Sequence, residues 1–529
     1  MFIGSLLGAL LLNDAQVSIA SSIKGHVFKS NVNKGKIMTI VKVESELVLR
    51  AHEKDNTYLH DEAFAPVDKE ITATELDVIG EIPKELDGVY IRNGHNPIHQ
   101  PPSGRYHWFD GDSMVHATAF KDGNATYRNR MVQTAGLLNE MEAGKGLYPG
   151  LRDGFEAESG LKNNAGTDVV LHNGEFKAMF SRCGQPYRLD PETLQTLGAD
   201  DFGGDWPKGV SAHSKVDERT GEFIFFTYSF NSKPYMEYGV VSADNKLICS
   251  TEIELSGPRL PHDSWITENY TILHDLPMYW DPELLKIGKK KLIYNTDLPS
   301  RYGVIPRYGK GSEIVWFDAD PTYMLHTVNA WEEGDEIVAY GFKQLTPVPE
   351  IEKGTPSPQI QNFFLSFKYM TPRLTEFRFN LKTGKCEERI IDETCAEMPG
   401  MNNRYLGIKS QYVYNTLAAE TPLFLMSGIQ KFDLQAHKEL DRYNLPEGKY
   451  MGQPVFAPNK NSTIEDDGYL MAYVIDGTEA EVYIWHGQRI GEGPVARVQL
   501  PQRIPGGSHA YFGNGEDIRK AQAKREITM

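Results

Sequence analysis

Cysteine is scarce in this sequence of 529 residues, and its four copies show no CxxC spacing: Cys183, Cys249, Cys386 and Cys395. Such a set argues against a disulfide framework and is typical of reduced, buried thiols. Positive charge is also in deficit, because 55 Lys and Arg face 72 Asp and Glu, for a formal charge of −17. A nucleic-acid partner needs a basic face, and anionic lipid attracts basic segments. The charge therefore argues against a nucleic-acid partner and against simple electrostatic attachment to a membrane.

Several catalytic signatures are missing as well. The sequence contains no GxSxG elbow, no P-loop and no dinucleotide-binding fingerprint. These absences argue against a serine hydrolase of the elbow type and against nucleotide- and dinucleotide-dependent enzymes. Long apolar runs are missing too, since Phe2–Leu12 is too short to span a bilayer as a helix.

The first residues of the chain leave three interpretations open. Ser18–Ala20 resembles the cleavage site of a secretory signal, but no basic segment precedes the apolar run. Otherwise the stretch is an extension of the folded domain, or an interfacial anchor for an enzyme of lipid-soluble substrates. We expect a cytoplasmic protein, with peripheral membrane contact or a secretory signal as the alternatives. The sequence predicts no oligomeric state.

Turn signals are what the rest of the chain has in abundance. Beyond an N-terminal extension of residues 1–56, short apolar or alternating runs are separated by Asp-Gly and Asn-Gly dipeptides, which are hairpin signals. In one example, Asp168–His172 and Glu175–Phe180 flank Asn173-Gly174. No linker rich in Gly, Ser or Pro divides residues 57–529, so we expect one all-β domain. A sandwich stack, a large barrel and a propeller all fit this pattern.

Four histidines lie near the edges of strand-like runs: His213, His262, His326 and His509. His262 precedes the alternating stretch Trp265–Leu273, which predicts a strand that would fix the ring as a metal ligand requires. Histidines this far apart in sequence meet only if the fold brings repeated units to one axis. Four neutral imidazoles suit Fe, Zn, Cu or Ni, and they differ from structural zinc sites and from the two-His-one-carboxylate iron type.

The sequence resembles the carotenoid cleavage oxygenases, a family that includes stilbene-cleaving relatives. The resemblance runs from about Tyr58 to Phe512 and rests on the four histidines and an ordered set of motifs: Phe64–Val67, Leu86–Gly94, His107–Asp112 and Glu465–Tyr469. It implies a seven-bladed β-propeller with an axial metal site under a cap of long loops and helices. The candidate cap segments are Val132–Leu161, Asp275–Tyr308 and Leu345–Thr371.

The resemblance also implies a metal and its supports. In the family, four histidines hold one Fe(II) per chain with open positions for O2, which assigns His213, His262, His326 and His509 as ligands. Three glutamates accept hydrogen bonds from ligating histidines in the family. Glu397 matches one of them, whereas Gln453 and Arg182 stand at the other two positions. A Gln can accept such a bond but an Arg cannot, so either iron binding is altered or the alignment is shifted there.

The implied reaction is oxidative cleavage of a carbon–carbon double bond by O2 to two carbonyl products. The expected partners are O2 and an apolar substrate, which we take to be a carotenoid or apocarotenoid. Stilbene-cleaving relatives grip a phenol with a Tyr and a Lys; Tyr148 supplies the first, but Ser181 stands in place of the second. Phe109 completes the expected substrate contacts. The alternatives are a stilbene-cleaving dioxygenase and a non-catalytic carrier of apolar ligands.

Overall fold

The computed structural model describes residues 39–50, 59, 63–153, 160–230, 232–285, 287, 292–349 and 366–528. Strands dominate these residues and pair with their sequence neighbours in antiparallel sheets. One ten-stranded sheet consists of two such units joined by the short strand β29 (Tyr450–Met451). Counted this way, the described strands form seven blades of a β-propeller, as the resemblance predicts.

Blades 2 to 5 each run from a central strand to a rim strand. The central strands of neighbouring blades, such as β7 and β11 or β15 and β21, pack against one another. From centre to rim, blade 2 consists of β7 (Asp168–His172), β8 (Glu175–Met179), β9 (Tyr187–Leu189) and β10 (Thr196–Ala199), and blade 3 of β11 (Lys215–Asp217), β12 (Glu222–Tyr228), β13 (Met236–Val241) and β14 (Leu247–Ile253). Blade 4 consists of β15 (Trp265–Ile266), β16 (Tyr270–Asp275), β19 (Ser300–Pro306) and β20 (Val315–Ala319), and blade 5 of β21 (Tyr323–Glu333), β22 (Glu336–Gln344), β23 (Pro372–Asn380) and β24 (Lys385–Asp392).

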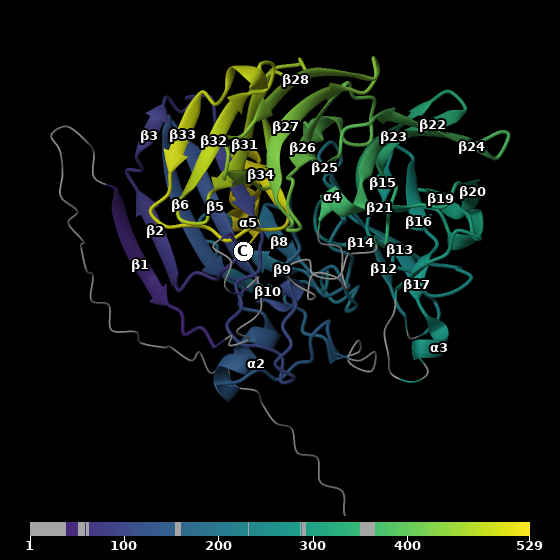
Figure 1. Ribbon diagram of the computed structural model, residues 1–529, viewed down its shortest axis with the longest axis horizontal. Helices are drawn as coiled ribbons and strands as arrows, with labels where there is room; N and C mark the ends of the chain where they lie inside the picture. Colours follow the sequence, from purple (N-terminus) through teal and green to yellow (C-terminus); the bar gives the residue numbers. More distant parts are fainter. Residues whose placement is uncertain are drawn as a thin grey trace, which may run out of the picture.

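Both ends of the chain contribute to closing the ring. The late strand β34 (Ala510–Asn514) pairs with the early strand β4 (Gly88–Arg92) and becomes the centre of blade 1. The early strand β3 (Val78–Gly80) pairs with β33 (Ala496–Gln499) at the rim of blade 7. Figure 1 shows β3 and β33 side by side. Such shared strands join the first blade to the last, so the ring has no open edge there.

The remaining strands complete blades 1, 6 and 7. They are β5 (Met114–Lys121), β6 (Asn124–Met131), β2 (Lys69–Thr74) and β1 (Ile40–Glu46) in blade 1; β25 (Ala396–Gly400), β26 (Tyr412–Ala418), β27 (Met426–Asp433) and β28 (Lys438–Asn444) in blade 6; and β30 (Val455–Pro458), β31 (Gly468–Ile475) and β32 (Ala480–His486) in blade 7. Strands β1 and β2 widen blade 1 beyond four strands.

The turn between β7 and β8 follows directly from its sequence. Asn173 and Gly174 both have positive φ, at 49° and 68°. A two-residue hairpin of this type needs positive φ at both positions, which Asn-Gly tolerates best. The predicted hairpin is confirmed, with β8 ending one residue early at Met179.

The prediction of a single strand over Trp265–Leu273 is wrong. The chain turns after β15 and returns as its antiparallel partner β16. The N–H of Thr267 donates to the carbonyl of Tyr270 at 2.8 Å, and its hydroxyl donates to the Glu332 carboxylate of β21 at 2.7 Å. An alternating pattern cannot reveal this turn, because a side chain from the next blade stabilises it.

Helices and longer excursions lie between strands. They include α2 (Ala135–Ala143), α3 (Pro282–Leu285), α4 (Phe367–Met370), α5 (Gly515–Thr528), the hairpin of β17 (Met278–Trp280) and β18 (Leu292–Tyr294), and the 3-10 turns η1 (Trp108–Asp110), η3 (Gly311–Glu313), η5 (Asn403–Tyr405) and η6 (Ile490–Glu492). No helix among the residues described is long and apolar enough to cross a membrane.

The expected cap segments are only partly outside the blades. The segment Asp275–Tyr308 was assigned too broadly, because β19 within it is the third strand of blade 4 and pairs with both β16 and β20. In Val132–Leu161, residues 154–159 lie outside the described residues, and in Leu345–Thr371, residues 350–365 do. The described part of the first segment carries α2 between β6 and β7.

Candidate metal centre

Each of the seven blades contributes one polar side chain at or just before its central strand. In ring order from blade 1 these are His509, Asp168, His213, His262, His326, Glu397 and Gln453. A propeller directs its central strands to one axis. Four nitrogen donors and three hydrogen-bond acceptors, widely separated in the sequence, are brought together in this way.

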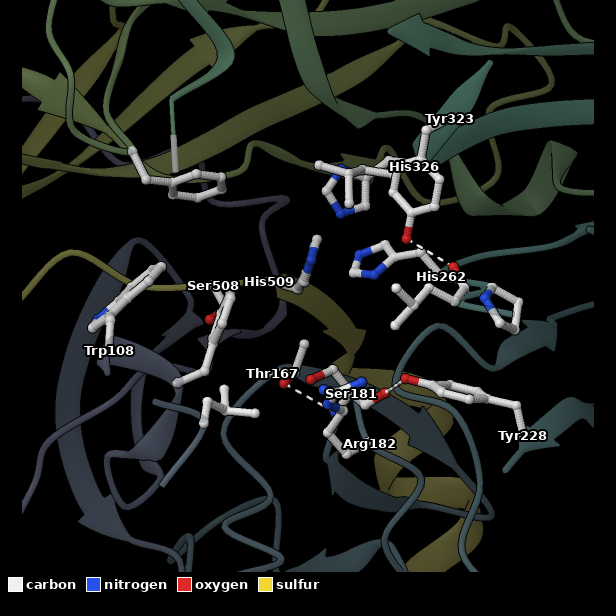
Figure 2. Close-up of a pocket in the computed structure, with 16 residues that line it drawn as sticks. Trp108, Thr167, Ser181, Arg182, Tyr228, His262, Tyr323, His326, Ser508 and His509 are labelled. Carbon is white, nitrogen blue, oxygen red and sulfur yellow. Dashed lines mark hydrogen bonds between the residues drawn. The ribbon is translucent and has the colours of Figure 1, made fainter. Parts of the chain in front are cut away.

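The four histidine rings form a tight cluster, and Figure 2 shows three of them, His262, His326 and His509. The Nε2 atoms of His213 and His262 are 3.0 Å apart. Ring centroids lie 4.5 Å apart for His213 and His509, and 4.7 Å apart for His326 and His509. His326 also lies 5.2 Å from His262 between ring centroids. The structure therefore brings together all four histidines that the sequence singles out.

Three of the four rings are held through Nδ1. Nδ1 of His326 lies 2.6 Å from Glu397 Oε2, and Nδ1 of His509 lies 3.0 Å from Gln453 Oε1. Nδ1 of His213 lies 3.0 Å from Asp168 Oδ2. A proton on each Nδ1 serves these acceptors and leaves the lone pair on Nε2.

His262 is the exception. Within the described ranges its Nδ1 has no hydrogen-bond partner, and its one polar contact is the Nε2 approach to His213. The order of the blades explains this difference. Each of the other three histidines has an acceptor on an adjacent blade, but both neighbours of blade 4 carry histidines themselves.

Burial sets the protonation of the cluster. It lowers the pKa of His262 to about 3, with further lowering from the charge of a protonated His326. Burial first, and then the other imidazoles, hold the pKa of His213 and His509 well below the ordinary value. Burial also raises the pKa of Asp168 to about 7. The imidazoles of His213, His262 and His509 are thus neutral near pH 7, which is the form that binds a metal.

The donors suit a divalent transition metal. Two ligands at right angles with metal–nitrogen bonds of about 2.1 Å are about 3.0 Å apart, and the two Nε2 atoms of His213 and His262 are separated by 3.0 Å. Nε2 of His326 is buried without a hydrogen-bond partner among the described residues, which is expected of a nitrogen that binds a metal. Two acidic side chains, Asp168 and Glu397, lie next to the cluster and would contribute negative charge beside a bound cation. An all-imidazole set fits Fe, Zn, Cu and Ni alike.

An apolar cavity of about 750 Å³, partly open to solvent, meets the cluster on one side. Its lining shown in Figure 2 comprises Trp108, Phe109, Leu151, Thr167, Ser181, Arg182, Tyr228, Leu260, Pro261, His262, Tyr323, Leu325, His326, Phe424, Ser508 and His509. This described lining contains no carboxylate. Trp108 stacks on Phe109 with centroids 5.2 Å apart, so aromatic faces form one wall.

The predicted substrate and support residues divide between two places. Phe109, Ser181 and Arg182 line the apolar cavity. The Arg182 guanidinium lies 5.1 Å above the ring of Phe230. Tyr148 instead lines a smaller neighbouring cavity that shares Phe109 with the first. Its hydroxyl accepts a hydrogen bond from Asn139 at 2.9 Å.

A second cavity of about 880 Å³ shares only His326 and His509 with the first, so the imidazole cluster separates the two. Its lining includes His213, Asp168, Lys215, Asp263, Asn403 and Gln453. Lys215 and Asp263 form an ion pair at 2.7 Å. The rest of its lining is largely apolar, with Val455 and Phe456 among it, but the charged side chains set this cavity apart from the first, and we call it the polar cavity.

Asp168 is the member of the site that sequence reasoning missed. Its hairpin was predicted, but no motif marks it. The distribution of the predicted residues could have indicated it, because six of the seven central strands have a predicted histidine ligand or acceptor and only β7 has none. Reading that signal requires the order of the blades, which is a property of the fold.

The sequence of the chain matches one family model over most of its length. The model described as retinal pigment epithelial membrane protein matches residues 64–514. A carotenoid 9,10(9′,10′)-cleavage dioxygenase of Crocus sativus is 33% identical over 524 residues, covering 91% of this chain and 93% of the relative. A carotenoid cleavage oxygenase of Mycobacterium tuberculosis is 30% identical, covering 88% of this chain and 98% of the relative.

Solved structures share the fold. The lignostilbene dioxygenase of Pseudomonas brassicacearum aligns with a TM-score of 0.77 and 24% identity, over 87% of this chain and 99% of its own. A variant of the Synechocystis apocarotenoid oxygenase aligns with a TM-score of 0.76 and 24% identity, over 88% of this chain and all of its own, 100%. The chain belongs to the carotenoid cleavage oxygenase family and is an enzyme of the dioxygenase class.

Proposed function

We propose that this protein cleaves a carbon–carbon double bond of a carotenoid or apocarotenoid with O2, at one Fe(II) held by His213, His262, His326 and His509. The observation that carries the proposal is the position of the four imidazoles, which form one end of an apolar cavity. The relatives that share about a third of the sequence support the substrate class, because their names state carotenoid cleavage.

The protein's own part in the reaction is binding, orientation and exclusion of water. Iron bound at the imidazoles supplies the chemistry of O2. The aromatic and aliphatic wall favours a hydrocarbon chain over water, since burying apolar surface contributes roughly 25 cal/mol per Å². Such a wall holds one double bond of a long polyene near the cluster. No acid–base pair is needed for this task, and the described cavity lining has no carboxylate.

The two tyrosine hydroxyl groups of the cavity are already engaged with the backbone. Tyr228 donates to the carbonyl of Ser181 at 2.8 Å, and Tyr323 donates to the carbonyl of Leu260 at 2.8 Å. Phenol recognition by a Tyr–Lys pair has little support here, because Tyr148 lines another cavity and Ser181 carries no amine. These contacts favour a carotenoid over a stilbene as the substrate.

The test is a substrate panel with the iron-loaded protein. Carotenoids, apocarotenals and hydroxystilbenes are incubated separately, and the aldehyde or ketone products are identified by chromatography and mass spectrometry, with 18O2 as the label. We expect labelled carbonyl products from the carotenoid class and none from the His326→Ala variant. Products from hydroxystilbenes alone would replace the substrate class. Stoichiometric binding of a carotenoid without iron and without products would favour the carrier.

A further inference from the structure

Asp168 lies on the one central strand for which the sequence predicts neither a metal-binding histidine nor a residue that supports one. It is the first residue of β7, the central strand of blade 2. We propose that Asp168 is the positioning residue of His213, whose hydrogen bond turns Nε2 of that ring toward the metal. The inference rests on the metal centre of the proposed function.

The geometry of the Asp168 carboxylate is fixed at both oxygens. Oδ2 lies 3.0 Å from Nδ1 of His213, and Oδ1 accepts the N–H of Val169 at 2.7 Å. The backbone carbonyl of the same residue accepts from the side-chain amide of Asn93 at 3.0 Å. A carboxylate held on a strand in this way can define the orientation of an imidazole, because its own rotamer is restricted.

The order of the blades makes Asp168 the available acceptor for His213. Blade 3 carries His213, and its neighbours are blade 4 with His262 and blade 2 with Asp168. Glu397 serves His326 from an adjacent blade, and Gln453 serves His509 in the same manner. Asp168 thus completes a pattern in which each acceptor reaches across one boundary between blades.

Other groups near His213 cannot take this role. Asp263 is paired with Lys215 at 2.7 Å and accepts the N–H of Thr327 at 2.8 Å. Arg182, at the position where the family resemblance places a glutamate, lines the other cavity and has only donors. Removing Asp168 would leave the Nδ1 proton of a buried ring without its acceptor, and the ring would lose the contact that sets its tautomer.

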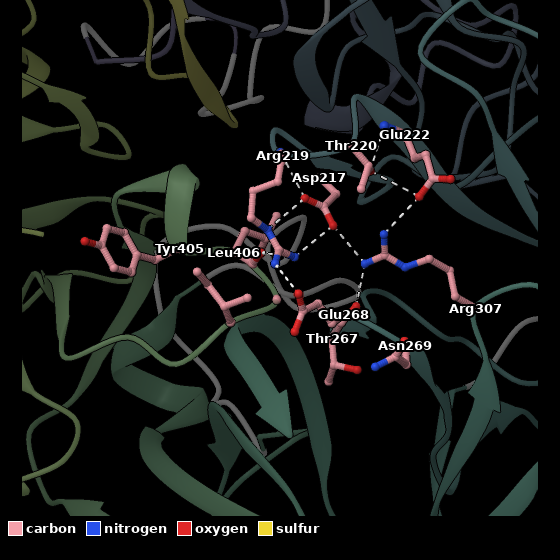
Figure 3. A network of polar contacts seen from close by, with 12 residues as sticks. Asp217, Arg219, Thr220, Glu222, Thr267, Glu268, Asn269, Arg307, Tyr405 and Leu406 are labelled. Atoms are coloured by element: carbon pink, nitrogen blue, oxygen red, sulfur yellow. Dashed lines mark hydrogen bonds and ion pairs between the residues drawn. The ribbon is translucent and has the colours of Figure 1, made fainter. Parts of the chain in front are cut away.

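The experiment compares metal binding in three variants of the full-length protein. Asp168→Ala removes the acceptor, and Asp168→Asn keeps an acceptor oxygen of similar size. Asp217→Asn is the matched control: Asp217 ends β11, which begins just after His213, and is buried against Arg219 and Arg307 at 2.9 Å each (Figure 3). Co(II) and Fe(II) affinities are measured by competition with a chelator, and the visible spectrum of the Co(II) form reports ligand geometry.

We expect Asp168→Ala to weaken metal binding by roughly 10–100-fold, the usual effect of losing a support behind a ligating histidine, and to shift the Co(II) spectrum. Asp168→Asn should recover most of the affinity and the parental spectrum. Asp217→Asn should lower the melting temperature but leave the affinity unchanged.

Three results would overturn the proposal. They are parental affinity and spectrum in Asp168→Ala, an Asp168→Asn protein no better than the alanine variant, and a parental protein that binds neither metal. Failure of the proposed function looks different: the parental protein would bind metal and show the expected order of variants while cleaving nothing in the substrate panel.

Discussion

The two cavities that meet at the histidine cluster differ in the side chains that line them. One is lined mainly by aromatic and aliphatic side chains, and the other has Asp168, Lys215 and Asp263 among its apolar residues. His262 faces the first cavity, His213 faces the second, and His326 and His509 face both. The chemistry of the two linings therefore indicates the first cavity as the place for an apolar substrate.

The difference teaches how one buried site serves two needs. A metal cation and its carboxylate supports must be neutralised and hydrogen-bonded when they leave water. A polyene needs a wall without unsatisfied polar groups, and the hydroxyls of Tyr228 and Tyr323 meet this need by donating to the backbone at 2.8 Å each. The imidazole cluster lets charge gather on one side and hydrocarbon on the other.

The largest expected effect comes from removing the cluster itself. His326→Ala should abolish iron binding and turnover together, because a ring shared by both cavities would be lost and the Glu397 carboxylate would be left buried without its partner. Bound iron is measured by metal analysis and turnover by product formation. A His326→Ala protein with full iron and full activity would show that the four-histidine site is wrong.

Filling the apolar cavity should come next. Leu151→Trp adds bulk to the lining of this cavity, so we expect a loss of turnover of about 100-fold or more with iron retained, since a misplaced substrate loses orientation. Asn403→Trp places the same bulk in the polar cavity and should leave turnover within a few-fold of the parent. Equal losses of turnover in the two variants would show that the substrate does not bind in the apolar cavity alone.

Arg182→Glu should have an intermediate effect. The change removes a cation from the wall of the apolar cavity and offers an acceptor on the side where His262 lacks one. We expect tighter iron binding, by up to about tenfold, measured by chelator competition. Unchanged affinity would mean that residue 182 does not reach the surroundings of the metal.

The sequence predicts the parts of this site that are encoded locally. The Asn173-Gly174 hairpin, the four histidines and the two acceptors Glu397 and Gln453 all lie where short motifs place them. Asp168 and the turn after β15 were missed for a shared reason. Each depends on a side chain from a neighbouring blade, and neighbours in a ring are set by the closed topology and not by local pattern.

The smallest expected effect comes from Gln453→Glu on the polar side. Gln453 already accepts from Nδ1 of His509 at 3.0 Å and from the N–H of Ala510 at 3.1 Å, so the substitution keeps both accepted bonds and adds a charge. It also gives up the bond that the Gln453 amide donates to the carbonyl of Pro399 at 2.9 Å. The added carboxylate stabilises a more positive metal and strengthens the basicity of the ligand. Iron affinity should therefore rise a few-fold and the midpoint potential should fall, while the product pattern stays the same because the apolar wall is untouched. Potentiometry and chelator competition read the first two quantities, and a changed cleavage position would mean that the polar cavity also orients the substrate.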